Sequence, residues 1–458
     1  MKTEIRFVLI TLLFVFTLLS ASISEDDLFI VVGTLFSITV CLIPVRRVSS
    51  DKISIESLCL IGLTAYSVAV PIHHLIYQDY DTVYLIKGFI YCVVGIYFMV
   101  VGNFIHYRRN RVHNTSTIDT EYDWITFYRI GWVVFLTGLL ASFLALYLTV
   151  GLQAYFTAGY AGRALLKRGA GPVELGLYHA VFGFLMIALA GSMTKQKRIR
   201  NARFFMFLLL FTIGFVSYVS FLGIRRPSFF LLFSLVVLLN LAYPRFNRKS
   251  VLAVGVPLVL LLAIFASFRQ VLSDQGLLVA LTYVSENISF EWLDLSVTEL
   301  GAPFRVLLDV TQTWSSDEYR FGYTFLQSIP NLLPSAFGVD VLSLSEEYTI
   351  RNFSSAYISI GGNMGFFPIA EGYVNAKWLG VVFYMIALGY LVSAIQFNAL
   401  TKRSPMLLLC LVLTPPWFVF LVRTDMASYS KVLFYSIFMP YVFALCLEFL
   451  RNNISSSK

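Results

Sequence analysis

Long apolar runs follow one another along most of the chain, and short polar turns separate them. A run of roughly 17–25 apolar residues is the length that an α-helix needs to cross about 30 Å of hydrocarbon. The pattern therefore predicts an all-α polytopic membrane protein with about twelve transmembrane helices. The predicted spans lie at about residues 6–23, 28–45, 55–76, 83–105, 125–149, 172–193, 204–222, 228–243, 251–268, 370–396, 405–422 and 431–450.

The charges in the loops predict how these spans are oriented. Basic residues follow every even-numbered span, for example Arg108 and Arg109 after the fourth. Cytoplasmic loops carry an excess of lysine and arginine, so these loops and both termini are predicted to be cytoplasmic. The loops at residues 24–27 and 77–81 are acidic, and they are predicted to face outward.

Composition supports the membrane class and narrows the choice of partners. Hydrophobic residues make up 58% of the 458 positions and charged residues only 13%, too few to cover the surface of a soluble protein. The net charge of +8 comes from basic residues in the short loops between spans, which indicates topology rather than a nucleic-acid partner. The five cysteines lie inside or at the edges of apolar runs, so neither a disulfide framework nor a metal site is expected. The first apolar run lacks a clear cleavage site, and it is predicted to be kept as a span.

One long segment, at about residues 269–369, interrupts the series of spans and divides the chain into three parts. Residues 1–268 hold the first nine predicted spans, and residues 370–458 hold the last three and a cytoplasmic C-terminus. Charges alternate with apolar residues at positions 285–309. This pattern predicts amphipathic helices that lie on the outward-facing surface of the membrane.

Three further features of this long outward-facing loop can be predicted from local sequence. Residues 328–334 hold two prolines and predict a rigid turn, and residues 346–353 predict another short helix. The glycine-rich run at residues 361–365 cannot be regular helix, and glycine permits main-chain N–H groups to approach a ligand. Pro368 then suits the first turn of the tenth span.

Arginines in three outward segments break the charge rule. They are Arg163 and Arg168 (with Lys167) in the loop after the fifth span, Arg225 and Arg226 after the seventh, and Arg423 after the eleventh. A structural interpretation is anchoring to lipid headgroups or ion pairing with the acidic loop. A functional interpretation is that these arginines bind an anionic substrate, because the guanidinium group binds phosphate through two parallel hydrogen bonds.

The chemistry that these residues permit needs neither a metal nor another cofactor. No HExxH motif, phosphate-binding Walker loop or GxSxG motif occurs at a plausible place. Converging arginines could hold the diphosphate of a polyprenyl-linked sugar and stabilise the charge that develops as the diphosphate leaves. A nearby carboxylate could deprotonate the acceptor hydroxyl. A single displacement of this kind inverts the anomeric carbon.

Three short segments of this chain resemble the bacterial O-antigen polymerases (Wzy, oligosaccharide repeat-unit polymerases). They are residues 365–375, which read Gly-Phe-Phe-Pro-Ile-Ala-Glu-Gly-Tyr-Val-Asn, the Gly-Ile-Arg-Arg-Pro-Ser turn at residues 223–228, and the Val-Arg-Thr-Asp turn at residues 422–425. Phe367 stands where that family often has a small hydroxyl residue, and Ala-Lys-Trp replaces its usual Phe-Gly after Asn375.

The resemblance implies a glycosyltransferase with a GT-C-like fold in the bacterial inner membrane. Such an enzyme moves a growing glycan from undecaprenyl diphosphate to the non-reducing end of the next lipid-linked repeat unit, at the periplasmic face. Its partners would be the undecaprenyl-diphosphate-linked oligosaccharide and membrane lipids. A chain-length regulator is a further partner that the sequence leaves open.

Candidate site residues follow from the motifs and from the charges of the outer segments. The candidate bases are Glu371, Asp425 and Glu286, and the candidate diphosphate-binding residues are Arg225, Arg226 and Arg423. Other candidate substrate contacts are Arg163, Arg305, Arg320, Arg351, Gly362, Asn363, Tyr373 and Asn375. The arginines at 305, 320 and 351 are open to either of two roles, as substrate contacts or in internal salt bridges. Glu371 also has a structural interpretation, since a carboxylate near a helix N-terminus complements the helix dipole.

Two other functions are alternatives to a polymerase. A flippase for lipid-linked oligosaccharides, or another polytopic transporter, tends to show repeat symmetry and ionisable residues near the bilayer midplane. This chain shows no convincing internal repeat, and its charges gather at the outer ends of the spans. An O-antigen ligase is the second alternative. The related ligases use a loop histidine, and the long loop of this chain contains none.

Overall fold

The structure is a computed structural model, and it describes most of the chain. The described residues are 2–23, 26–42, 53–110, 122–149, 151, 171–194, 202–221, 226–243, 246, 249–250, 253, 282, 300–314, 318–332, 341–353 and 365–456. Every regular element within these ranges is a helix, which confirms the predicted all-α class.

The predicted spans correspond closely to the observed apolar helices. These are α1 (Lys2–Ile23), α2 (Asp26–Leu42), α3 (Ile55–Tyr77), α4 (Thr82–Asn110), α5 (Trp124–Thr149), α8 (Gly171–Met193), α9 (Ala202–Phe221), α10 (Arg226–Ala242), α18 (Pro368–Lys402), α19 (Pro405–Leu421), and the continuous series α20 (Met426–Leu433), η5 (Phe434–Phe438) and α21 (Met439–Ser456). Among the described residues, 7 helical segments are long and apolar enough to cross a membrane, and four more apolar helices are shorter. The predicted span at 251–268 lies almost wholly outside the described residues, so the number twelve stays a prediction.

The long loop contributes the short helices α13 (Ala302–Thr313), α14 (Tyr323–Leu326), α15 (Ser328–Asn331) and α16 (Leu344–Asn352). The short helix predicted at residues 346–353 is confirmed by α16, whose N-terminus is closed by a capping box between Ser343 and Glu346. The rigid turn predicted at residues 328–334 begins as one helical turn, α15, instead. Leu332, the residue after α15, accepts a 2.9 Å hydrogen bond on its main-chain oxygen from Tyr435 Oη in η5. This bond fastens the end of α15 to the last span.

Helix α13 is amphipathic, as the sequence predicts, and residues 285–299 of the same prediction lie outside the described residues. Its apolar residues Phe304, Leu307 and Val310 are fully buried, and the helix packs against α3, α4 and α18. A methyl group added at Gly88 of α4 would lie only 2.6 Å from Leu308 Cδ2, which shows how closely α13 approaches α4. The apolar face of α13 is thus buried by other helices, and the placement of this segment on a membrane surface stays a prediction.

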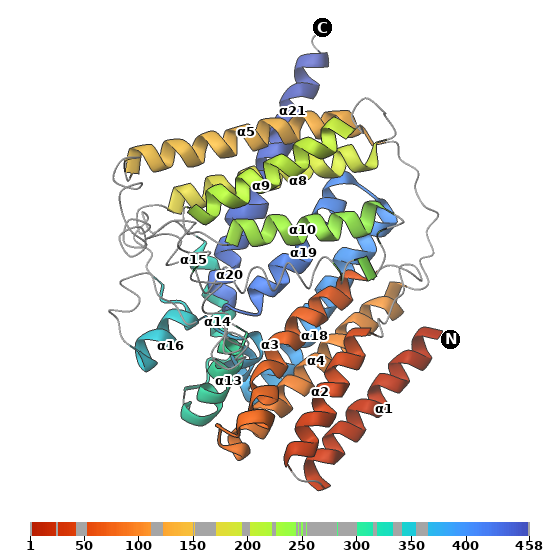
Figure 1. The fold of residues 1–458 in the computed structure, drawn as a ribbon, viewed down its shortest axis with the longest axis vertical. Coiled ribbons are helices and arrows are strands. Elements are labelled where there is room, and N and C mark those ends of the chain that lie inside the picture. Colours follow the sequence, from red (N-terminus) through yellow and green to blue (C-terminus); the bar gives the residue numbers. More distant parts are fainter. Residues whose placement is uncertain are drawn as a thin grey trace.

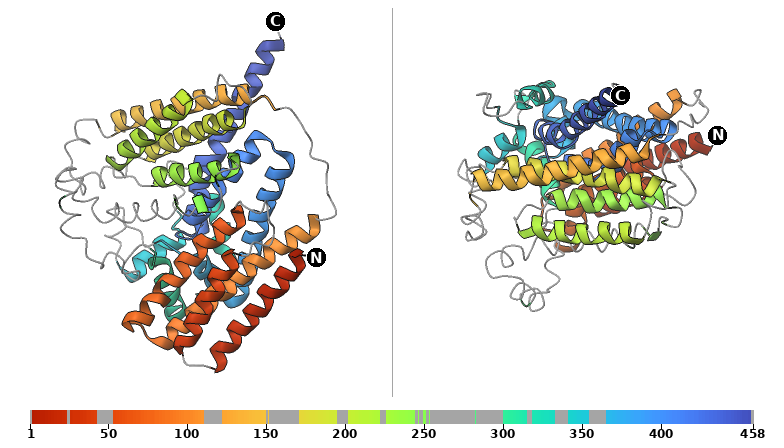
Figure 2. Two further views of the ribbon diagram at one scale, coloured as in Figure 1. Left: turned by 45° about the vertical axis from the view of Figure 1, so that its right-hand side comes forward. Right: turned by 90° about the horizontal axis from the view of Figure 1, so that it is seen from above.

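The helices form two groups with a shared middle layer (Figure 1). Helices α5, α8 and α9 lie together on one side, and α1 to α4 lie on the other, with α10, α18 and α19 between them. The same separation is visible in the left panel of Figure 2. Helices α13, α15 and α16 gather at one end of the bundle, opposite the end where the N-terminus lies. We call the end that holds α13, α15 and α16 the loop end.

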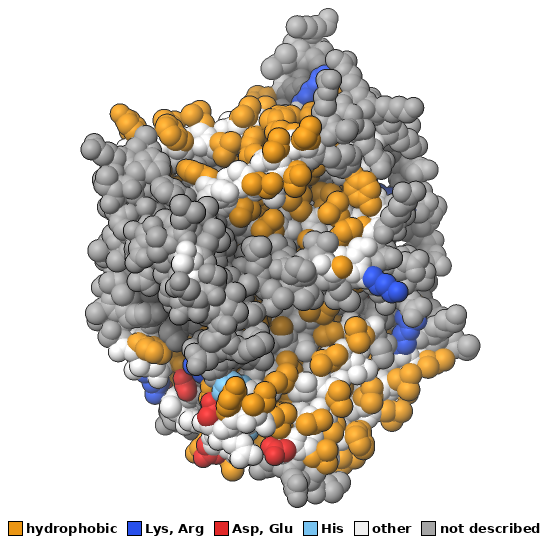
Figure 3. Space-filling model, viewed as in Figure 1, with side chains coloured by type: hydrophobic (Ala, Val, Ile, Leu, Met, Phe, Trp, Pro, Cys, Tyr) orange, Lys and Arg blue, Asp and Glu red, His pale blue; other side chains and the backbone are white. Residues whose placement is uncertain are grey.

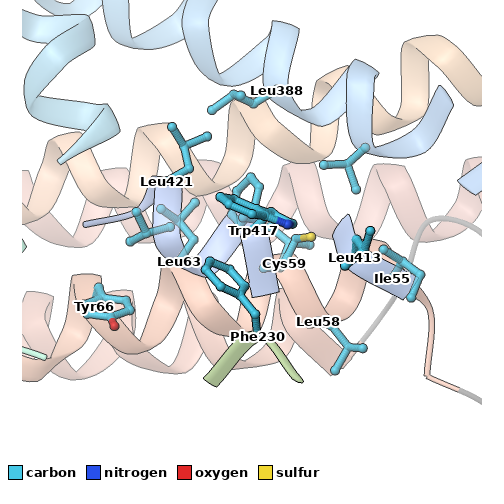
Figure 4. Packing of buried hydrophobic residues seen from close by; sticks show 14 of the residues in the cluster. Ile55, Leu58, Cys59, Leu63, Tyr66, Phe230, Leu388, Leu413, Trp417 and Leu421 are labelled. Atoms are coloured by element: carbon cyan, nitrogen blue, oxygen red, sulfur yellow. The ribbon is translucent and has the colours of Figure 1, made fainter. Parts of the chain in front are cut away.

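Buried aromatic and aliphatic side chains fill the middle of the bundle. Trp417 of α19 stacks on Phe230 of α10 with ring centroids 4.2 Å apart, and the two rings lie one above the other beside Cys59 of α3 in Figure 4. On the outside, hydrophobic side chains cover the flanks of the helices, and the visible acidic side chains gather at the loop end (Figure 3). This distribution suits helices whose flanks contact lipid.

Helix α18 is broken into two arms. Ala376 and Lys377 have non-helical backbone angles, with φ −160° and ψ 43° at the first and φ 51° and ψ −140° at the second. A methyl group at Gly380 would lie 1.9 Å from Gly372 O, although residues eight apart in a straight helix are about 12 Å apart. Ile369 and Met385 both contact the same place on α4, at Gly95. The short arm (residues 368–375) therefore folds back antiparallel along the long arm (residues 378–402).

Candidate functional site

The turn between α19 and α20, residues 422–425, is the meeting point of the segments that the sequence singles out. Phe366, just before the short arm, donates its backbone N–H to Arg423 O at 3.2 Å. Gly365 adopts φ +75° there, and a methyl group on it would lie 2.4 Å from the same carbonyl oxygen. A side chain is therefore excluded at residue 365 both by the backbone angle and by the close approach.

Asp425 closes the N-terminus of α20 and is completely buried. Its Oδ1 accepts the backbone N–H of Ser428 at 2.7 Å, which is the usual N-cap hydrogen bond. Its Oδ2 accepts the backbone N–H of Ser345 in α16 at 2.8 Å, and the Ser428 hydroxyl at 3.3 Å. Both carboxylate oxygens are thus engaged, and Asp425 ties the long loop to the 422–425 turn.

Glu371 in the short arm is also completely buried. Its Oε2 accepts the backbone N–H of Met426 at 2.9 Å, so the first turn of α20 is held by two carboxylates from different segments. Its Oε1 makes no hydrogen bond among the described residues, and the hydroxyls of Thr324 and Tyr384 lie near the carboxylate. Both the helix-dipole interpretation and a chemical role are compatible with this geometry.

Arg226 lies at the first position of α10 and is exposed. Its guanidinium carbon lies 4.9 Å from the ring centroid of Phe420, near the end of α19. Phe420 precedes Arg423 by three residues, and Arg423 is partly buried. The structure therefore brings two of the predicted diphosphate-binding arginines to the same end of α19, from segments almost 200 residues apart in the chain.

Asn375 ends the short arm, and both polar atoms of its side chain make internal hydrogen bonds. Its Nδ2 donates to Thr324 Oγ1 at 2.7 Å and to Glu371 O at 2.9 Å, and its Oδ1 accepts the Gly322 N–H at 2.8 Å. The main chain adds a bond from Phe321 N to Asn375 O, 3.0 Å long. Asn375 thus positions the loop against the arm, a role that its spacing from Glu371 only partly indicated.

Tyr373 points away from Glu371, as the helical spacing predicts. Its ring packs edge-to-face against Tyr91 of α4, with centroids 5.1 Å apart, and against Tyr319, with centroids 6.4 Å apart. Only 5% of Tyr373 is exposed. Tyr373 is therefore a packing residue between the arm, α4 and the loop, and its neighbour Tyr319 is nearer the surface.

The loop arginines 320 and 351 are in internal ion pairs. Arg320 pairs with Glu347, and Arg351 Nη1 donates to Glu318 Oε1 at 2.8 Å. Both guanidinium groups also lie beside Trp314, at 5.8 Å and 5.2 Å from its ring centroid. These contacts support the salt-bridge interpretation for both arginines.

Arg305 is partly buried on α13, close to the pair formed by Tyr348 and Asp309. The Tyr348 hydroxyl donates to Asp309 Oδ2. Burial raises the pKa of Tyr348, the hydrogen bond to Asp309 and its charge raise it further, and the Arg305 charge opposes this. Tyr348 thus stays neutral and fastens α16 to α13.

Five of the predicted site residues lie outside the described part of the chain. They are Arg163, Arg225, Glu286, Gly362 and Asn363. Other groups of the site were not found from the sequence, because a main-chain N–H and a distant hydroxyl carry no local signal. They are Met426 N, Ser345 N, Thr324 and Tyr384. Within the described residues, no group of three or more His, Cys, Asp or Glu side chains could hold a metal ion.

The fold and the site together define a class of protein. The chain is a multi-pass α-helical membrane protein in which a long loop and a broken helix enclose buried carboxylates, with arginines beside them at one end of the bundle.

A family model of the O-antigen polysaccharide polymerase Wzy matches residues 5–453, so the chain belongs to this family. The resemblance noted in three short segments is thereby confirmed over nearly the whole chain. Membership supports the activity of a glycosyltransferase-type polymerase that acts on lipid-linked oligosaccharide repeat units. No curated protein and no solved structure matches the chain.

Proposed function

We propose that this protein polymerises a surface polysaccharide by transferring the growing glycan from undecaprenyl diphosphate to an incoming lipid-linked repeat unit. The loop end of the bundle faces the periplasm, both termini are cytoplasmic, and the membrane is the bacterial inner membrane. The chemistry is a metal-independent single displacement with inversion, on a fold of the GT-C type. The helix count and the division of the chain at residues 268 and 369 belong to the same proposal.

One observation carries the proposal. Three segments that sequence alone singles out, at residues 226, 365–375 and 422–425, come together although almost 200 residues of chain separate the first from the last. Arg226 lies over Phe420 at 4.9 Å, Phe366 N donates to Arg423 O at 3.2 Å, and Met426 N donates to Glu371 at 2.9 Å. The proposal rests on this convergence of the three segments near the end of α19.

Arg226 and Arg423 bind the diphosphate of the donor. The guanidinium group keeps its charge at any relevant pH and matches phosphate oxygens with two hydrogen bonds at once. As the bond between the anomeric carbon and the diphosphate oxygen breaks, its electron pair moves to that oxygen. Cations fixed beside the leaving group stabilise this charge more in the transition state than in the ground state.

Glu371 is the proposed base, and Asp425 is a positioning residue. The acceptor hydroxyl forms the new bond to the anomeric carbon, and its proton passes to the carboxylate. Asp425 already accepts hydrogen bonds on both oxygens, whereas Glu371 Oε1 has no hydrogen-bond partner among the described residues. Glu371 is fully buried, so the acceptor must displace the loop around Thr324 to reach it. Glu286 stays a further candidate from the long loop.

Two arginine substitutions test this function. Full-length protein in phosphatidylcholine vesicles is given lipid-linked repeat units, and chain growth is followed on gels. Arg423→Ala and Arg226→Ala are expected to lower the rate by about 100-fold or more, as the loss of one charge-stabilising donor does elsewhere. Lysine at either position restores only part of the rate, because an ammonium group lacks the planar fork. Arg109→Ala is the matched control and leaves the rate unchanged. Arg109 lies in the last turn of α4, at the end of the bundle away from the loop end.

The same variants distinguish a polymerase from a flippase or a ligase in cells. A polymerase defect leaves surface glycolipid capped with a single repeat unit, a flippase defect removes even this unit, and a ligase defect leaves long polymer on the lipid carrier. Long ladders that persist in Arg226→Ala or Arg423→Ala cells at normal protein levels would show that the proposed site is wrong.

A further inference from the structure

Lys377 occupies the break in α18, in a backbone conformation that side chains disfavour. Its φ of 51° with ψ of −140° lies in the region that glycine adopts freely and other residues rarely do. Residues held in such conformations cluster at functional sites, because the surrounding structure must maintain them against a free-energy cost. Glycine at this position would remove the strain, which makes the lysine side chain a candidate for a functional contact.

The surroundings hold the break rigid. Arg320 N donates to Val374 O and Phe321 N donates to Asn375 O, both at 3.0 Å, so the loop binds the last carbonyls of the short arm. The Asn375 side chain adds the bond to Gly322 N. Because the neighbouring residues are held on both sides of this junction, the direction in which the Lys377 side chain leaves the backbone is fixed.

The ammonium group of Lys377 is exposed and lies over an aromatic ring. Its Nζ is 5.1 Å from the centroid of Tyr319, and Tyr319 in turn contacts Tyr373. Among the described residues, no carboxylate forms an ion pair with Lys377. The structure thus presents a preoriented cation at the loop end without a carboxylate partner in the described ranges, in contrast to Arg320 and Arg351.

A polymerase of the proposed kind must hold two diphosphates at once, since donor and acceptor are both lipid-linked. We infer that Lys377 binds the diphosphate of the acceptor, while Arg226 and Arg423 bind that of the donor. This inference rests on the proposed function. The ammonium group acts as a point charge toward the phosphate oxygens, and it takes no part in bond breaking.

The two proposed sites lie at opposite ends of the short arm of α18. Phe366 contacts Arg423 at one end, and Lys377 follows the other end, about 12 Å away for an arm of eight residues. Beside Lys377, the long arm presents Trp378, Leu379 and Phe383 with 56%, 46% and 68% exposure. This apolar face is continuous with the lipid-facing flank of the bundle, and it suits the polyprenyl tail of the acceptor.

A lysine beside a tryptophan also anchors helices at the membrane interface, and a cation near the end of a helix complements its dipole. Neither role requires the left-handed conformation, because a lysine one position further along the exposed arm would serve both without strain. Acceptor binding and a purely structural role therefore predict different results for Lys377→Gly. That change removes the backbone strain and the charge together.

The test is kinetic and uses full-length protein in phosphatidylcholine vesicles. Purified lipid-linked polymer serves as the saturating donor, and a single lipid-linked repeat unit is varied as the acceptor. Lys377→Met and Lys377→Gly are each expected to raise the acceptor KM by about tenfold or more, as the loss of a charge-assisted hydrogen bond does, with kcat within about twofold. Lys377→Gly is also expected to raise the Tm by a few degrees. Lys377→Arg retains the KM, and Lys402→Met, at the other end of α18, changes nothing.

Two substrate and lipid arms identify the anion. An acceptor with the same oligosaccharide on an uncharged polyprenyl ether should show one KM for wild type and Lys377→Met. A KM difference that persists with this acceptor, or one that arises only in vesicles with anionic phospholipid, overturns the inference. So does an unchanged KM in Lys377→Gly with a higher Tm, which marks a purely structural lysine. Wild-type protein that makes no polymer at all would instead overturn the proposed function.

Discussion

The α5–α8 pair and the α4–α18 pair are both held by main chains in close contact, but only the second includes the candidate site residues Glu371, Tyr373 and Asn375. In the first pair, a methyl group on Gly138 would lie 2.4 Å from Ala180 N, and one on Gly176 would lie 2.5 Å from Ser142 N. In the second pair, glycines make equally close contacts at one half, for example Gly102 with Ile386 O at 2.1 Å. The other half contains the break and the buried Glu371, and residues 320–322 of the long loop bind it there.

The difference shows how a membrane protein can combine a rigid scaffold with a polar candidate site. Small residues let helix backbones approach closely where lipid provides no hydrophobic drive for association. The half of α18 that contacts Gly102 is held rigidly against α4 in this way. The half near the break uses side-chain hydrogen bonds to hold a short arm that could not span the bilayer by itself. Scaffold and site are thus two halves of one helix pair.

Disrupting the scaffold pair should have the largest effect. Gly138→Leu is expected to force α5 and α8 apart, because the new side chain meets main-chain atoms that cannot rotate away. The free energy of unfolding should fall by about 3 kcal/mol or more, and little folded protein should reach the membrane. Thermal unfolding of the purified protein and its level in membranes measure this. Gly214→Leu in α9, where no atom lies within 4 Å of the added carbon, is the control. Equal losses in both variants would contradict the proposed scaffold.

Disrupting the polar half of the second pair should strongly lower activity while leaving the bundle folded. Asn375→Ala removes the bonds to Thr324, Glu371 O and Gly322, at a cost of about 2–4 kcal/mol from polar groups left without partners. Chain growth should fall by about 100-fold because the short arm and the base lose their position. Asn398→Ala, in the long arm of the same helix, loses only a bond within its own helix and should retain activity. Normal chain growth in Asn375→Ala would show that the junction is not needed for catalysis.

The smallest effect is expected at the loop surface. Arg351→Ala removes an ion pair whose partners are more than one-third exposed and a contact with Trp314. Exposed pairs contribute at most about 1 kcal/mol, so the Tm should fall by only a few degrees and the polysaccharide ladder should be unchanged. The exchanged pair Arg351→Glu with Glu318→Arg should recover part of the Tm. Short ladders in Arg351→Ala would instead support the substrate-contact interpretation that the sequence left open.

The spanning helices were predictable because their signal is local and strong. Residues 55–76 and 83–105 are apolar over a full membrane width, and α3 and α4 extend over the same stretches with a few residues added. The capping box at Ser343 and the proline at the start of α18 are equally local, although Pro368 opens the short arm and not the long arm that the tenth predicted span mostly covers.

The break in α18 was not predictable from the sequence. Residues 374–378 read Val-Asn-Ala-Lys-Trp, without glycine or proline, and alanine and lysine are good helix formers. The break is maintained by the amides of Arg320 and Phe321, which lie more than 50 residues earlier in the chain. The pairing of Arg320 with Glu347 is likewise tertiary, and no local pattern encodes it.

The antiparallel path of α18 also constrains the order in which the protein can be made. The long arm alone is long enough to leave the translocon as a spanning segment. The short arm, however, is fastened by Arg423 O and Met426 N, which the ribosome adds about 50 residues after Phe366 and Glu371. Its docking must therefore wait until α19 and the turn that follows it have been made. The candidate site is completed late, so a chain truncated before α19 would lack the residues that fasten the short arm.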